Sequence, residues 1–218
     1  MGTSRGGELV KWMDMTLREF QAALASSSPT PGGGSAAAVA LGQAASLAVM
    51  VCDLTLGKDK WSEGWVNAET TQQIAIPMMN QAGALATEDS DAFDGVMAGF
   101  GLPKESDEQK TIRREAIRAA TLKAAEVPYE TATKALELLQ CLPELARTGN
   151  ANAVTDVGVS GLLASAAAKG AVFNVEINLD SLPEEYGQEM RNDMMSLKEQ
   201  IRITSREVMD AVRDRMNG

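Results

Sequence analysis

The stretch from Pro29 to Ala38 constrains the fold of this chain more than any other. It reads Pro29-Thr30-Pro31-Gly32-Gly33-Gly34-Ser35 and continues with three alanines. The glycines remove every side chain at the point where an Ala-rich helix is predicted to begin. A helix N-terminus carries unpaired N–H groups and about half a positive charge. The segment therefore predicts either a binding site for an anion or polar heterocycle or a tight loop that lets two helices pack closely. Its spacing matches neither a P-loop nor a dinucleotide fingerprint.

Helical signals dominate the rest of the sequence. Capping boxes of the form Ser/Thr-x-x-Glu/Gln begin at Thr16, Ser106 and Ser181. With only 4% aromatic residues, the chain must fill its interior with small side chains and methionines, which favours close-packed helices, some of them between subunits. The fold class predicted is all-α, a single-domain multi-helix bundle. The predicted helices span residues 16–26, 35–56, 67–100 (kinked or divided at Pro77), 106–127, 128–140, 143–149, 150–170 and 181 to near the C-terminus.

Two segments are left outside these helices. Residues 172–179 alternate polar and apolar side chains, so they are interpreted as a short isolated strand or as the frayed end of the preceding helix. Residues 1–13 are interpreted as a leader, disordered or derived from the start site or the expression vector. The helical domain is then expected to span residues 14–218.

Charge and residue usage exclude several classes of function. The net charge is −10, which disfavours nucleic acid and anionic membranes as partners. No histidine occurs, so Ser-His-Asp and Cys-His catalysis are excluded and no metal site is expected. The two cysteines, Cys52 and Cys141, lie far apart in apolar helical contexts. They are predicted to be buried free thiols, which suits a cytoplasmic protein.

A cluster of carboxylates from Glu88 to Asp94 is the first candidate for chemistry. On a helix Asp89 shares a face with Ala92 and Phe93, and Phe93 is expected to be buried there. Desolvation beside an apolar face would raise the pKa of Asp89, as a general acid requires. The alternative is a solvated acidic face, which is the expectation for Glu88, Asp91 and Asp94.

Further candidates are spread along the chain, and each has a structural alternative. Gly149 and Asn150 offer another helix start with N–H and amide donors, or simply a junction between two helices. Asp156 is a lone charge on a helix of small residues, and Asn174 and Asn178 suit recognition of an amide-like edge or, equally, turn formation. The basic residues considered as anion contacts, or otherwise as solvated surface charges, are Lys58, Lys60, Arg147 and Lys169.

Five segments in order resemble one family, the cyclodeaminase domain of formimidoyltransferase-cyclodeaminase and its stand-alone relatives, which include methenyltetrahydrofolate cyclohydrolases. The resemblance covers roughly residues 14–215. It is carried by Pro29–Ser35, Leu54–Lys58, Asp89–Phe93 with Leu102-Pro103-Lys104, Gly149-Asn150 with Asp156, and Phe173–Leu179.

The resemblance implies an all-helical homodimer, with a folate site in a cleft near the interface and a carboxylate catalyst carried over to Asp89. It implies one of two reactions at the carbon between N5 and N10 of tetrahydrofolate. Closure of 5-formimidoyltetrahydrofolate with release of ammonia is the first, and interconversion of 5,10-methenyl- and 10-formyltetrahydrofolate is the second. No tightly bound cofactor is expected, because the tetrahydrofolate derivative is itself the substrate. A non-catalytic folate-binding or helical assembly protein is the rival interpretation.

On this hypothesis Asp89 and Asp156 are the catalytic candidates. The residues expected to contact the substrate are Pro31, Gly32, Gly33, Gly34, Ser35, Lys58, Lys60, Gly149, Asn150, Asn174 and Asn178, with Lys58 and Lys60 holding a glutamate tail.

Overall fold

The structure, a computed structural model, describes residues 11–218, and within that range it is all-helical. The predicted fold class is confirmed, since no strand occurs in these residues. The segment 172–179 is regular helix rather than strand. The elements are η1 (Trp12–Asp14), α1 (Leu17–Leu24), α2 (Gly33–Thr55), η2 (Asp59–Gly64), α3 (Trp65–Phe100), α4 (Asp107–Thr148), η3 (Ala151–Ala153), α5 (Val154–Asp180) and α6 (Gln188–Asn217).

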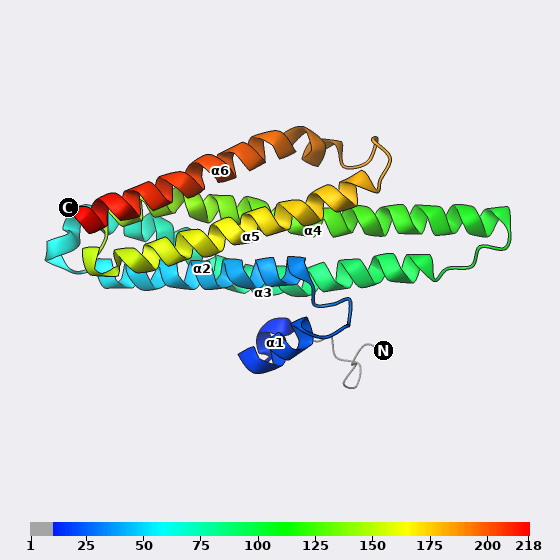
Figure 1. Cartoon of the computed structure of the whole chain (residues 1–218), viewed down its shortest axis with the longest axis horizontal. Coiled ribbons are helices and arrows are strands. Elements are labelled where there is room, and N and C mark those ends of the chain that lie inside the picture. The colour runs from blue at the N-terminus through cyan, green and yellow to red at the C-terminus, as the bar shows by residue number, and fades with distance from the viewer. Residues whose placement is uncertain (1–10) are drawn as a thin grey trace.

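Four long helices form the body of the molecule, and α6 covers one side of it (Figure 1). Helix α2 packs against α3 and α5, while α4 packs against α3, α5 and α6. Helix α2 is shorter than its neighbours, so its N-terminus lies part-way along α3 instead of at the end of the bundle. The first turn of α2 is therefore placed beside the middle of another helix.

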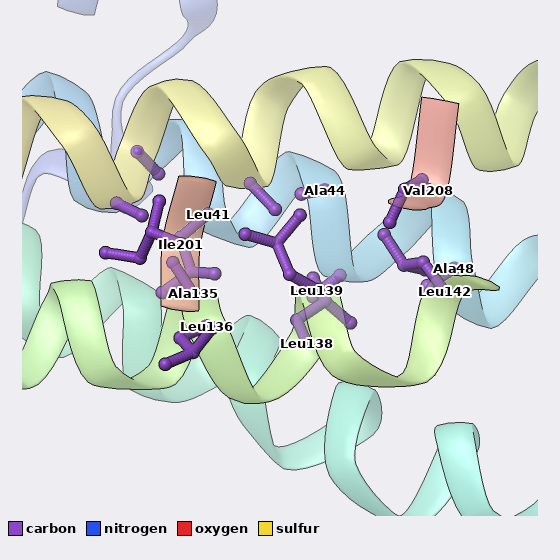
Figure 2. Packing of buried hydrophobic residues seen from close by; sticks show 14 of the residues in the cluster. Leu41, Ala44, Ala48, Ala135, Leu136, Leu138, Leu139, Leu142, Ile201 and Val208 are labelled. Carbon is purple, nitrogen blue, oxygen red and sulfur yellow. The ribbon is translucent and has the colours of Figure 1, made fainter. Parts of the chain in front are cut away.

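Alanine fills much of the core. Ala44 and Ala48 of α2 face Leu139 and Leu142 of α4 in one continuous cluster, and α6 completes it with residues such as Val208 (Figure 2). Small side chains on one helix opposite leucines on the next allow the axes to approach closely. The scarcity of aromatic residues is thus matched by close helix packing, as the composition predicted.

Helix α4 is one helix of 42 residues, although three were predicted in its place. Pro128 and Pro143 lie inside it, as Pro77 lies inside α3, and none of them ends a helix. Proline lacks the N–H that would bond the carbonyl four residues earlier. For Pro128 that carbonyl belongs to Ala124, and it accepts a hydrogen bond from Asn178 Nδ2 at 2.8 Å instead. A side chain of α5 thereby supplies the donor that the proline removes.

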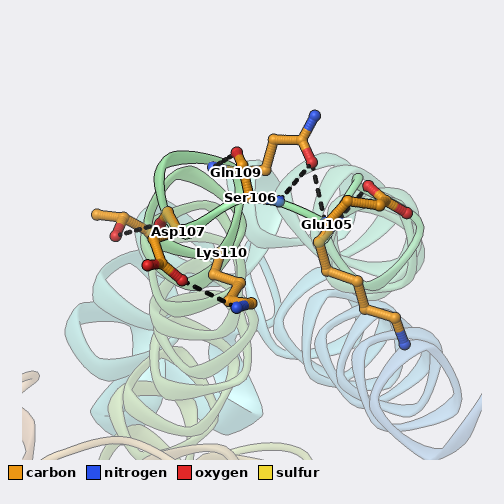
Figure 3. Close-up of polar contacts among 7 residues, drawn as sticks. Glu105, Ser106, Asp107, Gln109 and Lys110 are labelled. Atoms are coloured by element: carbon orange, nitrogen blue, oxygen red, sulfur yellow. Dashed lines mark hydrogen bonds and ion pairs between the residues drawn. The ribbon is translucent and has the colours of Figure 1, made fainter.

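Two of the three predicted capping boxes are present. Thr16 and Glu19 cap α1, and Ser106 and Gln109 cap α4 at the tip of the α3–α4 hairpin (Figure 3). The third prediction is wrong, because Ser181 terminates α5 and donates its hydroxyl to Asn178 O. Helix α6 begins only at Gln188, after Gly187 with a φ of 65°. That left-handed turn needs glycine and reverses the chain before the last helix.

Two helices, Gly33–Thr55 and Ala151–Asp180, are long and apolar enough to cross a membrane by length and composition. In each, 56% of the most apolar window is buried inside the bundle. The same length and apolarity are typical of a core helix, so this observation is weak evidence for a membrane span.

The Asn178–Ala124 contact leads to a prediction about stability. Replacing Asn178 with Ala leaves a carbonyl without its donor, which should cost about 1–3 kcal/mol of unfolding free energy. In a Pro128→Ala background the backbone N–H is restored, so the same Asn178→Ala change should cost clearly less. Denaturant unfolding of the two single variants and the double variant measures this coupling. Equal costs in both backgrounds would show that Asn178 does not replace the missing donor.

Candidate functional site

The carboxyl group of Asp89 on α3 lies directly against the first turn of α2. A Cβ placed on Gly34 would be 2.1 Å from Asp89 Oδ1 and 2.6 Å from its Cγ. No side chain fits in that space, so Gly34 has to be glycine for Asp89 to occupy its position. By contrast, a Cβ on Gly33 would meet nothing within 4 Å, and Gly33 is exposed. In the triglycine segment, the Asp89 carboxyl group therefore fills the space beside Gly34, while the space beside Gly33 is open to solvent.

A chain of hydrogen bonds ends on the same carboxyl group. Ser35 Oγ donates to Asp89 Oδ2 at 2.9 Å, and it lies 3.0 Å from Ser90 Oγ. Trp12 Nε1 donates to Ser90 Oγ at 2.9 Å. Because the single hydroxyl proton of Ser35 goes to Asp89, Ser90 must donate to Ser35. The side-chain donors of this chain thus end on Oδ2, and the Ser35 backbone N–H is a further donor to the same carboxyl group.

Burial raises the pKa of Asp89 above its ordinary value, while hydrogen bonds from the Ser35 side chain and backbone act in the opposite direction. The positive end of α2 also favours the anion. Desolvation is the largest of the causes that shift the pKa, so the acid form survives to higher pH than in an exposed aspartate. The predicted raised pKa of Asp89 therefore has a structural cause, although a different one from that expected.

The expected cause was burial beside Phe93, and this is wrong. Phe93 is 40% exposed, whereas Ala92 and Ser90 are buried. Asp89 is desolvated by the first turn of α2, on a different helix, which no periodicity within α3 can reveal. Its neighbours Glu88, Asp91 and Asp94 are exposed, in line with the solvated acidic face expected for them.

The Gly-rich segment supplies a helix start with no side chain at its N-cap. Gly32 is the N-cap of α2, and it has no side-chain oxygen that could bond the first N–H groups. Asp89 of α3 takes part of the role of an N-cap side chain, because its carboxyl group accepts a hydrogen bond from the Ser35 backbone N–H. The N–H groups of Gly33 and Gly34 have no acceptor within the helix. Pro31, which follows a cis peptide bond, is buried behind them.

Asn174 lies near this start, and Asn178 is engaged elsewhere. A Cβ on Gly170 would be 3.7 Å from the Cβ of Ala37, and α5 runs antiparallel to α2. One turn further along α5, Asn174 is therefore level with Gly33. Its Nδ2 donates to Gly170 O, while Asn178 Nδ2 donates to Asn174 O and to the Ala124 carbonyl. Asn174 thus lies where a ligand at the α2 start could meet it, whereas Asn178 has a structural task.

The remaining predicted residues lie at the opposite end of α2. Thr55 ends this helix 20 residues after Ser35, so the two ends are about 30 Å apart at about 1.5 Å per residue. Within one chain the structure does not bring this group to Asp89. Its members are Lys58, Lys60, Gly149, Asn150 and Asp156, and the two lysines are exposed.

Gly149 and Asn150 form the junction between α4 and α5 that was the structural alternative for them. Asn150 N donates to Thr55 Oγ1 at 3.0 Å, and its Nδ2 donates to Leu54 O at 2.9 Å. A Cβ on Gly149 would be 2.5 Å from Leu145 O. The pair therefore fastens the end of α2 to the α4–α5 turn. Asp156 follows, half-buried, in the first turn of α5.

Sequence reasoning missed Ser90 and Trp12. Ser90 is next to Asp89 and buried, so a small polar residue beside a candidate acid was the only available signal. Trp12 falls in the segment expected to be a leader. The structure differs from that expectation at residues 11–13, because Trp12–Asp14 form η1 and Trp12 bonds Ser90. Residues 1–10 of the expected leader lie outside the described residues.

No group of three or more histidine, cysteine or carboxylate side chains within residues 11–218 could hold a metal ion. Both cysteines are free. Cys52 is buried, and burial raises its pKa to about 12, while Cys141 is only half-buried. Burial also raises the pKa of Cys141, so neither thiol is activated as a nucleophile.

Comparison with known proteins identifies the family of this chain. The family model for formiminotransferase-cyclodeaminase matches residues 16–196. A methenyltetrahydrofolate cyclohydrolase of Methylorubrum extorquens is 32% identical over 93% of this chain and 98% of its own length. The formimidoyltransferase-cyclodeaminase of Rattus norvegicus is 29% identical, and this chain spans 38% of it. The crystal structure of a Thermotoga maritima formiminotetrahydrofolate cyclodeaminase superposes with a TM-score of 0.82 at 26% identity, covering 93% of this chain and 98% of that one.

Fold and site together define a helical protein, all-helical within residues 11–218, with a half-buried carboxyl group at a glycine-rich helix start. The chain belongs to the formiminotransferase-cyclodeaminase family, whose relatives above are named for cyclodeaminase and for cyclohydrolase activity.

The contact between Gly34 and Asp89 can be tested with two neighbouring glycines. Gly34→Ala forces the Asp89 carboxyl group away from Ser35, and such overpacking should cost about 1–3 kcal/mol of unfolding free energy. Gly33→Ala is the matched control, because its added methyl group meets open space. It should leave stability unchanged or slightly higher, since alanine favours a helix. Denaturant unfolding checks both, and equal stabilities for the two variants would contradict the close contact.

Proposed function

We propose that this chain is a folate one-carbon enzyme, and specifically a formimidoyltetrahydrofolate cyclodeaminase that forms 5,10-methenyltetrahydrofolate and ammonia. The observation that carries the proposal is the Asp89 carboxyl group, which lies against the glycine-rich start of α2 and whose pKa is raised by burial. An amine leaves poorly unless it is protonated, so this reaction needs an acid near the reacting carbon. Among the residues predicted to act, Asp89 is the one that the structure equips for this.

The proposed reaction proceeds in two steps. N10 attacks the formimidoyl carbon, and a tetrahedral intermediate forms in which that carbon is bonded to N5, N10 and an amino group. The Asp89 carboxyl group gives its proton to the amino group, and the C–N bond to the departing ammonia breaks as the cationic methenyl bridge forms. The carboxylate then faces this cation and stabilises it. The formimidoyl group enters as the protonated amidinium, so its nitrogen already carries two protons when N10 attacks. The proton lost by N10 then restores the acid, and the carboxyl group is unchanged over one turnover.

The groups around Asp89 have supporting roles in this proposal. Ser35 and Ser90 orient the carboxyl group through Oδ2 and do not need to touch the substrate. The first-turn N–H groups of Gly33 and Gly34 and the side chain of Asn174 offer polar contacts for the pterin ring. The bridging carbon keeps its oxidation level throughout, so the reaction requires neither a redox cofactor nor a carrier group.

Cyclohydrolase activity is the second candidate, and a specific observation favours it. The Methylorubrum extorquens relative bears this name and matches the chain over nearly its whole length. In that reaction ionised Asp89 accepts a proton from water as the oxygen attacks the methenyl carbon, and the C–N5 bond breaks to leave 10-formyltetrahydrofolate. A carboxylate with a raised pKa is a stronger base than usual, so the same environment serves this chemistry.

A side-by-side assay tests the function. The purified protein is given 5-formimidoyl- or 5,10-methenyltetrahydrofolate, and the methenyl absorbance is followed. Asp89→Asn keeps the size of the side chain and removes its acidic proton, so turnover should fall about 10²–10⁴-fold, with folding checked by circular dichroism. The ratio of the two wild-type rates decides between the reactions. Wild-type protein that binds tetrahydrofolate derivatives without turnover, or does not bind them, would instead support a folate-binding module or an assembly protein.

We also propose a cytoplasmic homodimer formed through the shared face of α2 and α5. Large exposed apolar side chains are spread along both helices, among them Met50 and Leu54 of α2 and Leu162, Phe173 and Ile177 of α5. Exposed apolar surface is typical of an interaction site. Only a second copy could bring Lys58, Lys60, Asn150 or Asp156 to Asp89, so their predicted roles depend on this dimer.

Sedimentation velocity tests the dimer. Wild-type protein should sediment as a dimer, and Phe173→Asp should shift it toward the monomer because a charge would be buried in the interface. Met195→Asp is a matched control on α6, where Met195 is 82% exposed, and should leave the dimer intact. A monomeric wild-type protein, or an equal effect of both variants, would contradict the proposed interface.

A further inference from the structure

Trp12 lies beside the site, but the proposed function gives it no role. Its indole ring packs against the small core that α2, α3 and α4 share, and its Nε1 donates to Ser90 Oγ at 2.9 Å. The ring also meets the Phe20 ring of α1 edge to face, with the ring centroids 6.5 Å apart. Helix α1 itself has no buried residue and lies apart from the long helices (Figure 1). Trp12 therefore connects the N-terminal segment to the residue next to Asp89.

The chemistry of the indole group determines the direction of the hydrogen bonds. An indole N–H donates and never accepts. Ser90 Oγ therefore accepts from Trp12 and keeps its own proton to give. Ser35 Oγ lies 3.0 Å away as the acceptor, and it donates in turn to Asp89 Oδ2 at 2.9 Å. The chain of hydrogen bonds consequently runs in one direction, from the indole through two hydroxyl groups to the carboxyl group.

Without the indole donor, the Ser90 hydroxyl has another acceptor within reach. A serine within a helix can donate to the carbonyl group four residues earlier, which here belongs to Ala86. Ser35 would then receive no hydrogen bond. Its own bond to Asp89 would weaken, because hydrogen bonds in a chain polarise one another. Ser35 and Ser90 are 0% and 4% exposed, so water has little access to replace the missing donor.

No charged side chain competes with this effect. The first turn of α2, which covers Asp89, has no ionisable side chain. The other ionisable groups at the level of Asp89 are Lys11 and Asp14 in and next to η1, Glu88 and Asp91 of α3, Lys123 and Glu126 of α4, and Lys169 and Glu176 of α5. None of them is buried, and none is among the causes that shift the pKa of Asp89. Those causes are burial and the hydrogen bonds from Ser35.

We propose that Trp12 is a positioning residue for Asp89, because its indole N–H fixes the direction of the hydrogen bonds through Ser90 and Ser35 that hold the carboxyl group at Oδ2. The placement of η1 is thereby transmitted to the carboxyl group through two hydroxyl groups. The consequence for catalysis rests on the proposed function, whereas the hydrogen-bond chain does not.

The indole N–H itself gives the first test. In ¹⁵N-labelled wild-type protein, the three indole signals are assigned by single Trp→Phe variants and followed by NMR across the pH range. The Trp12 signal should titrate with the same pKa as the Asp89 carboxyl carbon, because ionisation of the carboxyl group strengthens each bond in the chain. Trp65 is the matched control. Its Nε1 donates to Thr55 O at 3.1 Å at the other end of α2, so its signal should not follow Asp89.

Ser90→Ala interrupts the chain and leaves both of its ends. The Trp12 signal should then no longer titrate with Asp89, although the carboxyl carbon of Asp89 still titrates. An equal titration of Trp12 with and without the Ser90 hydroxyl would show that proximity alone causes it, and the proposal would be overturned. A Trp12 signal that does not follow Asp89 in the wild type would overturn it as well.

Trp12→Phe tests the effect on the carboxyl group. The variant keeps an aromatic ring over the core and removes the N–H donor. The pKa of Asp89 should therefore rise above its wild-type value, because the carboxylate loses hydrogen-bond support. Trp65→Phe should leave the pKa of Asp89 unchanged. An unchanged pKa in Trp12→Phe contradicts the proposal, and so does a lower one, which would mean that the smaller ring merely admits water to the carboxyl group.

Turnover separates this inference from the proposed function. With either folate substrate, the pH dependence of kcat in Trp12→Phe should move to higher pH together with the pKa measured by NMR, while KM stays close to the wild-type value. Wild-type protein without turnover would refute the proposed function, yet the NMR titrations would still decide whether Trp12 acts on Asp89. Normal turnover with the same pH dependence in both proteins, or a change in KM alone, would refute the positioning role only.

Discussion

The contact between the Asp89 carboxyl group and the Gly34 backbone is the constraint on which the site depends. Only glycine at position 34 leaves room for that carboxyl group, and only a carboxyl group there reaches Ser35. The first turn of α2 desolvates Asp89, while its N–H groups and Ser35 hold the carboxyl group in place. Burial and hydrogen bonding shift the pKa in opposite directions, and burial is the larger effect. An aspartate without a histidine partner is thereby equipped to hold a proton.

Helix packing keeps this contact in place. Because α2 begins part-way along α3, its N-terminus meets the side of another helix, and the alanine-rich core fixes the distance between them. Trp12, which precedes the long helices, stabilises the contact further by donating a hydrogen bond to Ser90 Oγ. On the neighbouring helix, Asn178 fills the hydrogen-bond gap left by Pro128, which lets α4 continue unbroken past the site.

The sequence was sufficient for the helical class and the α1 and α4 capping boxes, and it directed attention to Asp89. These follow from local patterns or from the family resemblance. It misled at Pro128 and Pro143, because a proline ends a helix only when no other donor reaches the freed carbonyl, and Asn178 is 50 residues away in sequence. It misled at Ser181, where a capping pattern lies in a turn instead of at a helix start. Local pattern also could not show that Phe93 is exposed and that Asp89 is buried by α2, since burial is decided between helices.

The candidate site shows the same division between local and distant information. Gly34 and Ser35 could be selected from the motif. Their different roles became clear only from the position of α3: Gly34 leaves space for the Asp89 carboxyl group, and Ser35 donates a hydrogen bond to it. Ser90 and Trp12 gave no pattern of their own. Distant residues such as Asn150 and Asp156 were associated with the site by resemblance, and within one chain they lie at its far end.

The most direct test of the central claim is the titration of Asp89 itself. Protein labelled with ¹³C at the aspartate carboxyl carbons is followed by NMR across the pH range, and the Asp89 signal is assigned by its loss in the Asp89→Asn variant. The account predicts a pKa for Asp89 above that of an ordinary aspartate. It also predicts that cyclodeaminase turnover is highest below this pKa and falls as pH rises through it, because the carboxyl group loses the proton that it donates. A pKa at or below the ordinary value would mean that the helix N-terminus outweighs burial, and Asp89 would then be a structural cap and not the proton donor.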